Sequence, residues 1–223
     1  MTISDGSDVE LGPDGVQAAR TEWRMHQILA AAAKLMVRDG FHRVSMQSIA
    51  DEAQMSVGLI YRYFAGKQEI LLGVIVDVLN SFADRIPQSM QTAGDDPIHR
   101  IAAGFRAYCE IIDENREAAL LAYRDGKTLD RSGREQTMNL EFKTSQPLRE
   151  AVTDAVAQGL LVDVDVDLFT YNLLILAQMW SLKYWHFKSR FSLDEYIKRQ
   201  SAFVLRSSID PHRRRKYQDL LTL

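Results

Sequence analysis

Apolar residues recur at intervals of three and four along most of this chain, the spacing that places them on one face of an α-helix. Residues 163–167 alternate acid and valine, but helical patterns flank them on both sides, so we expect a capped loop there and not a strand. The pattern therefore predicts an all-α protein. The predicted helices cover residues 18–38, 45–53, 56–64, 67–85, 97–114, 115–127, 130–158, 166–187 and 192–208, with a short basic helix after residue 211.

Proline residues set several of these predicted boundaries. Asp96 and Pro97 form a favourable helix start, because proline lacks only an N–H that the first turn leaves unpaired. Pro87 is expected to end the helix of residues 67–85. Pro147 lies inside the pattern of residues 130–158 and predicts a kink or break near Ser145.

Residues 45–67 form the most informative stretch, because they predict two short helices joined by a tight turn. Ser45 and Ser56 are placed to cap the two helices, and Gln54 lies in the turn between them. Ile60 and Phe64 are four residues apart and are expected to face the first helix. The remaining positions of the second helix then point wholly or partly outward: Val57, Gly58, Leu59, Tyr61, Arg62 and Tyr63.

This outward set is unusual for a helix that faces only water. A glycine permits close approach, while tyrosine hydroxyls and a guanidinium can donate to phosphates or base edges. Lys67 opens the next helix, whose N-terminal amides also favour a phosphate. The alternative is a helical hairpin inside an all-α core, with two half-buried tyrosines.

The same stretch resembles the helix-turn-helix of the TetR family of transcriptional regulators, whose signature is roughly T-x-x-x-I-A-x-x-A-G-V-S-x-G-x-L-Y-x-Y-F-x-x-K-x-x-L. The resemblance extends from Arg20 to Leu71. Gln54 replaces the turn glycine and Ile60 replaces the usual leucine, while Ser45 takes the threonine position. The matching residues are Ile49, Ala50, Ala53, Ser56, Gly58, Tyr61, Tyr63, Phe64, Lys67 and Leu71.

The resemblance implies a three-helix DNA-binding domain followed by a helical ligand-binding and dimerisation domain. Gln47 has the geometry for a bidentate contact with adenine, Arg62 can reach guanine or a phosphate, and Leu59 can touch a thymine methyl group. For each residue the alternative is solvated surface. The expected DNA contacts are Ser45, Gln47, Ser56, Val57, Gly58, Leu59, Tyr61, Arg62, Tyr63 and Lys67.

Charge and composition support this division of the chain. The net charge is −3, but residues 20–67 carry seven bases against four acids, whereas residues 1–19 carry four acids and no Lys or Arg. A basic excess confined to the predicted reading head suits phosphate contact. We expect an acidic disordered tail over residues 1–17, a DNA-binding domain over residues 18–66 and a regulatory domain over residues 67–223.

Other sequence features bear on location and chemistry. The chain has one cysteine, no secretory leader and no apolar run long enough for a membrane span, so we expect a cytoplasmic protein without a membrane partner. Its five histidines share no metal-ligand spacing, and no phosphate-binding glycine loop or nucleophile elbow occurs. We therefore expect neither an enzyme nor a bound metal or cofactor.

Aromatic and polar residues in the second half of the chain could line a ligand pocket. The candidates are Phe105, Tyr108, Cys109, Tyr123, Arg124, Phe142 and Trp180, with Met138, Tyr171, Met179 and Trp185 as further members. Ordinary core packing predicts the same residues. Arg124 lies in a Tyr-Arg-acid stretch similar to one in some regulators of fatty-acid or aromatic-acid catabolism, which implies an acidic or acyl-CoA effector with Arg124 or Arg149 as its counter-charge.

By resemblance, the last two long helices pair with those of a second copy to form a homodimer. The sequence hypothesis is then a repressor that binds a palindromic double-stranded DNA operator and is released by a small-molecule effector. The alternative hypothesis is a DNA-binding interaction protein of the same fold, with a filled body that does not respond to ligands.

Overall fold

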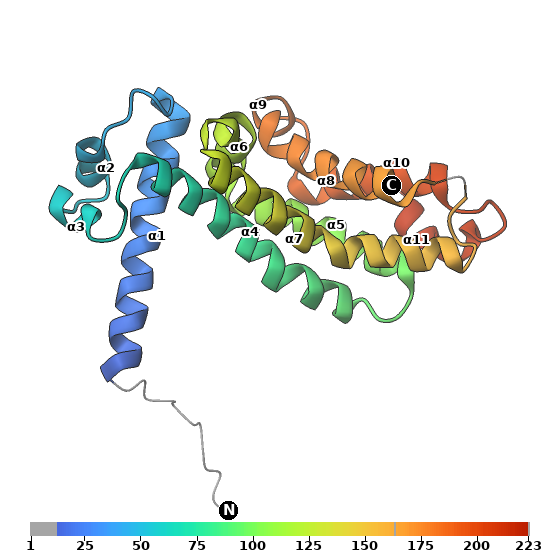
Figure 1. Ribbon diagram of the computed structural model, residues 1–223. Helices are drawn as coiled ribbons and strands as arrows, with labels where there is room; N and C mark the ends of the chain where they lie inside the picture. The colour runs from blue at the N-terminus through green and yellow to red at the C-terminus, as the bar shows by residue number, and fades with distance from the viewer. Residues whose placement is uncertain (1–12, 163, 223) are drawn as a thin grey trace, which may run out of the picture.

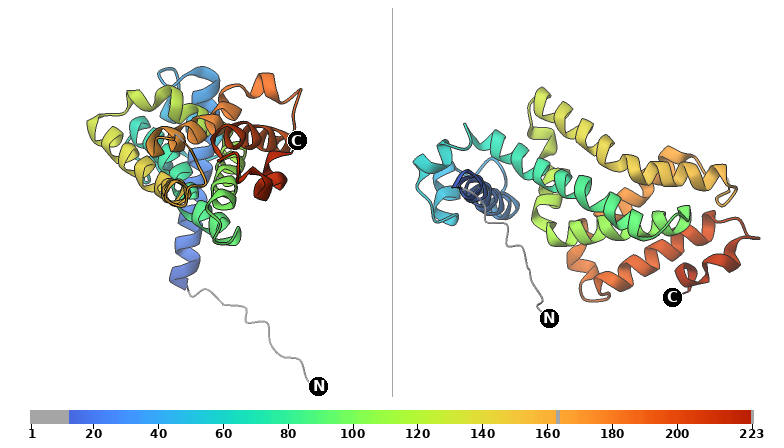
Figure 2. Two further views of the ribbon diagram at one scale, coloured as in Figure 1. Left: turned by 90° about the vertical axis from the view of Figure 1, so that its right-hand side faces the viewer. Right: turned by 90° about the horizontal axis from the view of Figure 1, so that it is seen from below.

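The structure, a computed structural model, describes residues 13–162 and 164–222 and is all-α (Figure 1). The N-terminal head consists of α1 (Pro13–Asp39), α2 (Met46–Glu52) and α3 (Val57–Tyr61). The long helix α4 (Lys67–Thr92) starts at the head and runs along the body (Figure 1). α1 stands across the end of the body, so its N-terminal half projects away from the other helices (Figures 1 and 2).

The head forms from local signals that the sequence predicts. The side chain of Ser45 accepts a hydrogen bond from the backbone N–H of Ser48 and caps α2, while Ser56 caps α3 by accepting from the N–H of Leu59. Gln54 adopts the left-handed conformation, with φ of 55°, that the turn requires. Ile60 and Phe64 are buried against α1 and α2, as their spacing predicts.

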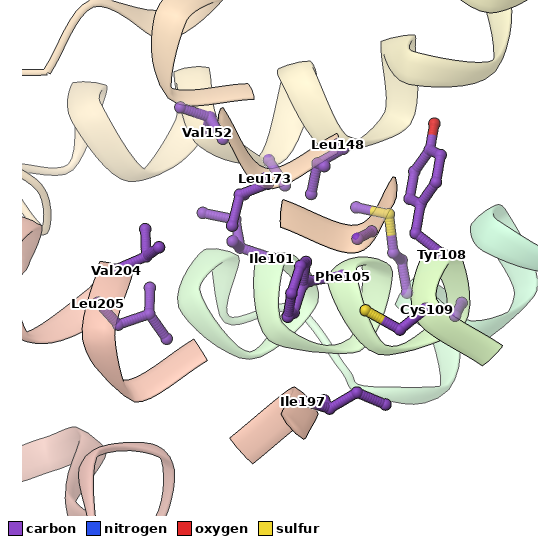
Figure 3. Packing of buried hydrophobic residues seen from close by; sticks show 14 of the residues in the cluster. Ile101, Phe105, Tyr108, Cys109, Leu148, Val152, Leu173, Ile197, Val204 and Leu205 are labelled. Carbon is purple, nitrogen blue, oxygen red and sulfur yellow. The ribbon is translucent and has the colours of Figure 1, made fainter. Parts of the chain in front are cut away.

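The body packs around α5 (Pro97–Glu114), which contacts α4, α7, α8 and α10. Ile101, Phe105 and Cys109 of α5 meet apolar residues from α7, α8 and α10 (Figure 3). The remaining body elements are α6 (Arg116–Asp125), η1 (Gly126–Thr128), α7 (Arg131–Ala157), α8 (Val166–Leu182), α9 (Tyr184–Phe187), α10 (Leu193–Ser208), η2 (Arg214–Tyr217) and α11 (Gln218–Leu221).

The helix end predicted at Pro87 was wrong, and of the kink or break predicted near Ser145 the break does not occur. α4 continues past Pro87 to Thr92, because Pro87 is exposed while Ile86 and Met90 on either side of it are buried in the body. α7 is a continuous helix through Pro147, next to which Leu148 is fully buried. A proline inside a helix costs about 3 kcal/mol, and burial of large apolar side chains, at about 1.5–3 kcal/mol each, offsets that cost.

Several boundaries also differ from prediction. α1 begins at Pro13, so residues 13–17 are helical rather than part of a disordered tail, and residues 1–12 lie outside the described residues. α3 ends at Tyr61 and not at Phe64. The predicted helix of residues 166–187 is divided at Lys183 into α8 and α9. Of the predicted loop at residues 163–167, residues 164 and 165 are not helical and Asp165 caps α8, while residue 163 lies outside the described residues.

The buried residues form two clusters that do not follow the boundary at residue 66. One cluster fills the body, and the other fills the head together with the first turns of α4. Leu121 of α6 and Leu129, just after η1, belong to the head cluster although both lie far along the chain. Across the described part of the chain, no helix combines the length and apolarity needed to cross a membrane.

Candidate nucleic-acid interface and ligand cavity

The outward face of α3 and the residues just after it is accessible, as the sequence predicts. Tyr61 is 55% exposed, and Gly58 and Arg62 are exposed as well. Tyr63 is partly buried. Ile60 has no exposed surface, which fixes the rotation of the helix and therefore the direction of Tyr61. Tyr61 is consequently a surface group, whereas Tyr63 packs against the edge of the head cluster, so the face around Tyr61 is free to meet a partner.

Gly58 lies in the N-terminal turn of α3, where the fold itself does not require a glycine. Its backbone φ is not positive, and a Cβ built on it would meet no atom within 4 Å. The space it leaves open lies outside the molecule. A missing side chain at this position lets an external surface approach the helix backbone closely.

Three predicted contacts already make hydrogen bonds within the head. Ser45 and Ser56 act as helix caps through their side-chain oxygens. Gln47 Nε2 donates to Asp51 Oδ1 at 2.8 Å, one turn along α2. Gln47 is exposed, so this bond can be exchanged for one to a base, but the carboxylate of Asp51 then lies beside the same surface.

Lys67 is placed differently from the expectation of a simple phosphate ligand. Its ammonium donates to the carbonyl oxygens of His42 at 3.1 Å and Val44 at 2.7 Å, and it lies 4.7 Å from the ring centre of Phe41. An ammonium has three donors. Two of them therefore hold the α1–α2 loop against the start of α4, and one remains for an external acceptor.

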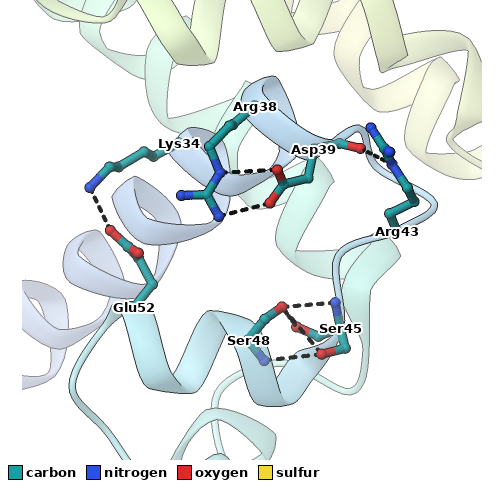
Figure 4. A network of polar contacts seen from close by, with 7 residues as sticks. All are labelled: Lys34, Arg38, Asp39, Arg43, Ser45, Ser48 and Glu52. Carbon is teal, nitrogen blue, oxygen red and sulfur yellow. Dashed lines mark hydrogen bonds and ion pairs between the residues drawn. The ribbon is translucent and has the colours of Figure 1, made fainter.

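Three other basic side chains of the head are also paired: Lys34, Arg38 and Arg43 (Figure 4). Lys34 forms an ion pair with Glu52 at 2.6 Å, and this hydrogen bond lowers the pKa of the Glu52 carboxyl. Arg38 pairs with Asp39, whose pKa it lowers, and Arg43 donates to the Asp39 carbonyl. Within the described residues, by contrast, Arg62 makes no hydrogen bond or ion pair, which leaves its guanidinium available at the end of α3.

The body contains a cavity of about 350 Å³ between α4, α5, α6, α7 and α8. This volume is within the usual range for small-molecule sites. Its wall is mostly apolar and it opens to solvent on one side. Phe82 of α4, Tyr108 of α5 and Leu174 of α8 form part of the inner wall, and Tyr123, Met138 and Ile175 are exposed lining residues.

A few polar groups converge on this cavity. The hydroxyl of Tyr108 donates to the Thr144 carbonyl at 3.0 Å, and burial raises the pKa of the tyrosine. Glu141 keeps contact with solvent, yet the surrounding protein raises the pKa of its carboxyl. Lys127 and Arg134 supply positive charge to the lining. An apolar body with a small number of charged or polar anchors is the usual composition of an effector site.

The structure brings together only part of the predicted pocket. Tyr108 and Tyr123 line the cavity, as do Met138 and Tyr171. The other predicted lining residues have different surroundings. Phe105 and Cys109 lie in the core, Phe142 is exposed on α7, Trp180 donates to Asp113 from within the core, Arg124 binds the end of α1, and Arg149 pairs with Asp167.

Sequence reasoning missed the contribution of α4 to the cavity. Ile75, Val78, Leu79 and Phe82 line it, although none of them is among the lining residues predicted from the sequence. The signal that could have identified them is length, because the apolar stripe of α4 continues well beyond the part that a three-helix head can cover. Among the described residues, no cluster of three His, Cys, Asp or Glu is placed to hold a metal ion.

Comparison with known proteins matches both parts of the chain. Residues 28–74 match the family model described as bacterial regulatory proteins, tetR family, and residues 94–207 match the tetracyclin repressor-like C-terminal domain. The HTH-type transcriptional regulator HbdR of Aromatoleum sp. (strain CIB) is 35% identical over 176 residues, which are 79% of this chain and 76% of that protein.

Two solved structures have a similar fold. The TetR family transcriptional regulator PfmR from Thermus thermophilus superposes with a TM-score of 0.72 and 23% identity, over 80% of this chain and 97% of that one. AibR in complex with isovaleryl coenzyme A and operator DNA gives a TM-score of 0.70 and 22% identity, over 79% of this chain and 95% of that one. At these identities the likeness shows the fold alone.

Proposed function

We propose a function from one premise: this chain belongs to the tetR family of bacterial regulatory proteins. It is accordingly a DNA-binding transcriptional regulator. The finer proposal is a homodimeric repressor that binds a near-palindromic operator and is released by a small effector. We assign DNA binding to residues 18–66 and regulation and dimerisation to residues 67–223.

The observation that carries the DNA-binding proposal is the free outward face of α3. Tyr61 and Arg62 are exposed and uncommitted, Gly58 leaves the helix backbone open, and Ile60 anchors the helix from behind. Inserted in a major groove, this face presents Arg62 to guanine or phosphate and the hydroxyls of Tyr61 and Tyr63 to phosphates. Ser45, Gln47, Ser56, Val57, Leu59 and the remaining donor of Lys67 are the further proposed contacts.

A dimer is proposed because one short helix reads too few base pairs for useful affinity. Two heads about 34–36 Å apart reach successive major grooves on one side of the duplex. Large apolar side chains on α8 and α10 support a pairing surface. Leu168 is 68% exposed and Phe203 72%, which is unusual for side chains that face only water.

The cavity supports ligand response over the alternative of a filled, unresponsive body. It has room for a small apolar molecule, and Lys127 and Arg134 can balance an acidic group. The effector class that fits is therefore an apolar acid or its coenzyme A ester. AibR, which shares this fold, has been crystallised with isovaleryl coenzyme A, and this adds to the case for an acyl thioester.

The dimer leaves the operator if the effector binds more tightly to a conformation in which the distance between the two heads does not match successive major grooves. A difference of about 1–3 kcal/mol between the two conformations changes operator affinity by roughly 5–150-fold. α4 joins the cavity to the head directly, since Ile75 to Phe82 line the cavity while Ile70 and Leu71 lie in the head cluster.

Selection of bound duplexes from a random pool tests the DNA-binding proposal. Enriched duplexes should contain two related half-sites about one helical turn apart in inverted orientation. Failure to enrich any duplex would contradict the proposal. Native mass spectrometry of the purified protein tests the effector proposal: a bound small molecule supports it, and its mass identifies the class.

A further inference from the structure

The segment from α6 to η1 has two faces that serve different parts of the molecule. Ala119, Ala122, Tyr123, Gly126 and Lys127 line the cavity. Leu121 has no exposed surface and Leu129 is 3% exposed, and both belong to the hydrophobic cluster of the head. A displacement of this segment by a molecule in the cavity therefore acts on the packing of the head.

Arg124 provides the polar link between this segment and α1. Its Nη2 donates to the Met36 carbonyl at 2.7 Å, and its Nη1 to the Val37 carbonyl at 3.3 Å. These carbonyls belong to the last turn of α1, where a cation is favoured. The Met36 carbonyl also accepts from the backbone N–H of Gly40 at 3.0 Å. Asp125 accepts from Arg124 Nε at 2.8 Å and so orients the guanidinium.

We propose that Arg124 is the positioning residue through which the state of the cavity is transmitted to the DNA-binding head. This rests on the proposed function, because it assumes that cavity and head are coupled. Arg124 follows the cavity residue Tyr123 directly, so a shift of the cavity wall moves the guanidinium relative to α1. A second hydrogen bond lies nearby, from Gln68 Nε2 to the Thr128 carbonyl at 3.1 Å. It is a single hydrogen bond between uncharged groups, and it joins η1 to α4 and not to α1.

Coupling between two binding sites is reciprocal, so DNA bound at the head must alter the cavity segment in turn. Hydrogen exchange of residues 119–129 can therefore report the coupling without knowledge of the effector. The probe is a duplex selected with the unaltered full chain, and each protein is measured with and without it. Because every variant is its own reference, general loosening by a mutation does not count as lost coupling.

The variants are Arg124→Met, which keeps the aliphatic stem without the donors, and Arg124→Lys, which keeps one donor group. Arg131→Met is the control, since it removes an equal charge whose side chain is 88% exposed and pairs with Glu135 on its own helix. In the unaltered chain and in Arg131→Met, the duplex should slow exchange in residues 119–129 by about fivefold or more. Arg124→Lys should retain part of this effect.

Arg124→Met should still bind the duplex, but exchange in the segment should change little on binding. Undiminished protection in Arg124→Met would overturn the proposal, and so would the absence of any change in the unaltered chain. If Arg124→Met does not fold, Arg124→Lys becomes the test, because lysine keeps only one donor group toward α1. Slowing of exchange in residues 119–129 as strong as in the unaltered chain would then overturn the proposal. Failure of the proposed function would be different, because then even the unaltered chain would bind no duplex.

Discussion

The Nζ of Lys67 lies 2.7 Å from the carbonyl oxygen of Val44, to which it donates a hydrogen bond. This bond joins the first residue of α4 to the loop that precedes α2, across an interval of chain that contains both reading helices. Lys67 thus fixes the position of the head on α4 as well as offering a donor to DNA. The two roles make different predictions for its replacement.

Lys67→Met should weaken both the fold and DNA binding. The loss of two charge-assisted hydrogen bonds should lower the free energy of unfolding by about 1–2 kcal/mol. Chemical denaturation measures this change, and a mobility-shift assay measures affinity. If Lys67 were only a phosphate ligand, affinity would fall while stability stayed the same. Arg20→Met, which removes a positive charge from an exposed position of α1, is the control for stability.

Gln54→Gly should stabilise the protein, because Gln54 holds a left-handed conformation that glycine adopts without strain. Relief of that strain exceeds the added entropy of a glycine in the unfolded chain, so we expect a gain of about 0.5–1 kcal/mol. Thermal or chemical denaturation tests this directly. A lower stability in Gln54→Gly would show that the glutamine side chain makes a compensating contribution.

Lys216→Met should change the acid sensitivity of the body. Burial alone would raise the pKa of Asp96, but hydrogen bonds from Lys216, the backbone of His99 and Tyr217 lower it from 3.8 to about 2. A carboxyl with a depressed folded pKa stabilises the protein above its unfolded pKa, and this contribution disappears as pH falls from about 4 to about 2.

Lys216→Met should therefore be less stable than the unaltered chain at pH 7, and the loss should be small because the Lys216 ammonium is exposed to water. The difference should shrink as pH falls through the same interval. Denaturation curves at several pH values between 7 and 2.5 provide the measurement. A difference that stays constant down to pH 2.5 would mean that Asp96 is not the group responsible.

Leu168→Glu and Phe203→Glu should separate the proposed dimer, because each places a negative charge on an exposed apolar position of α8 or α10. Sedimentation velocity should show monomers for the double variant and dimers for the unaltered chain. Gln136→Arg, which adds a charge to an exposed polar position on α7, should remain dimeric. A dimer that survives both apolar substitutions would assign the contact to another surface.

Features set by neighbouring residues could be predicted from the sequence. The caps at Ser45 and Ser56, the left-handed Gln54 and the buried Ile60 each depend on a few adjacent positions. A helix cap or tight turn is decided within one turn of backbone, so residue type and spacing are sufficient.

Features that depend on residues far apart in the chain could not be predicted from the sequence. Pro87 should end a helix by local rules, but the burial of Ile86 and Met90 against the body outweighs them. The partners of Lys67 precede it by more than twenty residues, and those of Arg124 by more than eighty. Core and cavity residues have the same composition, so Phe105 and Phe82 could be distinguished only by the packing of five helices around them.

The outward face of α3 is the proposed DNA-reading surface, and one mobility-shift experiment tests it. The Tyr61→Ala/Arg62→Ala variant is compared with the unaltered chain on a duplex selected by the latter. Both changes are at exposed positions, so the fold and the dimer should be unaffected within about 0.5 kcal/mol. We predict that affinity falls at least tenfold, by the ~1–3 kcal/mol of each lost contact. Binding at full strength by a folded, dimeric variant would contradict the account.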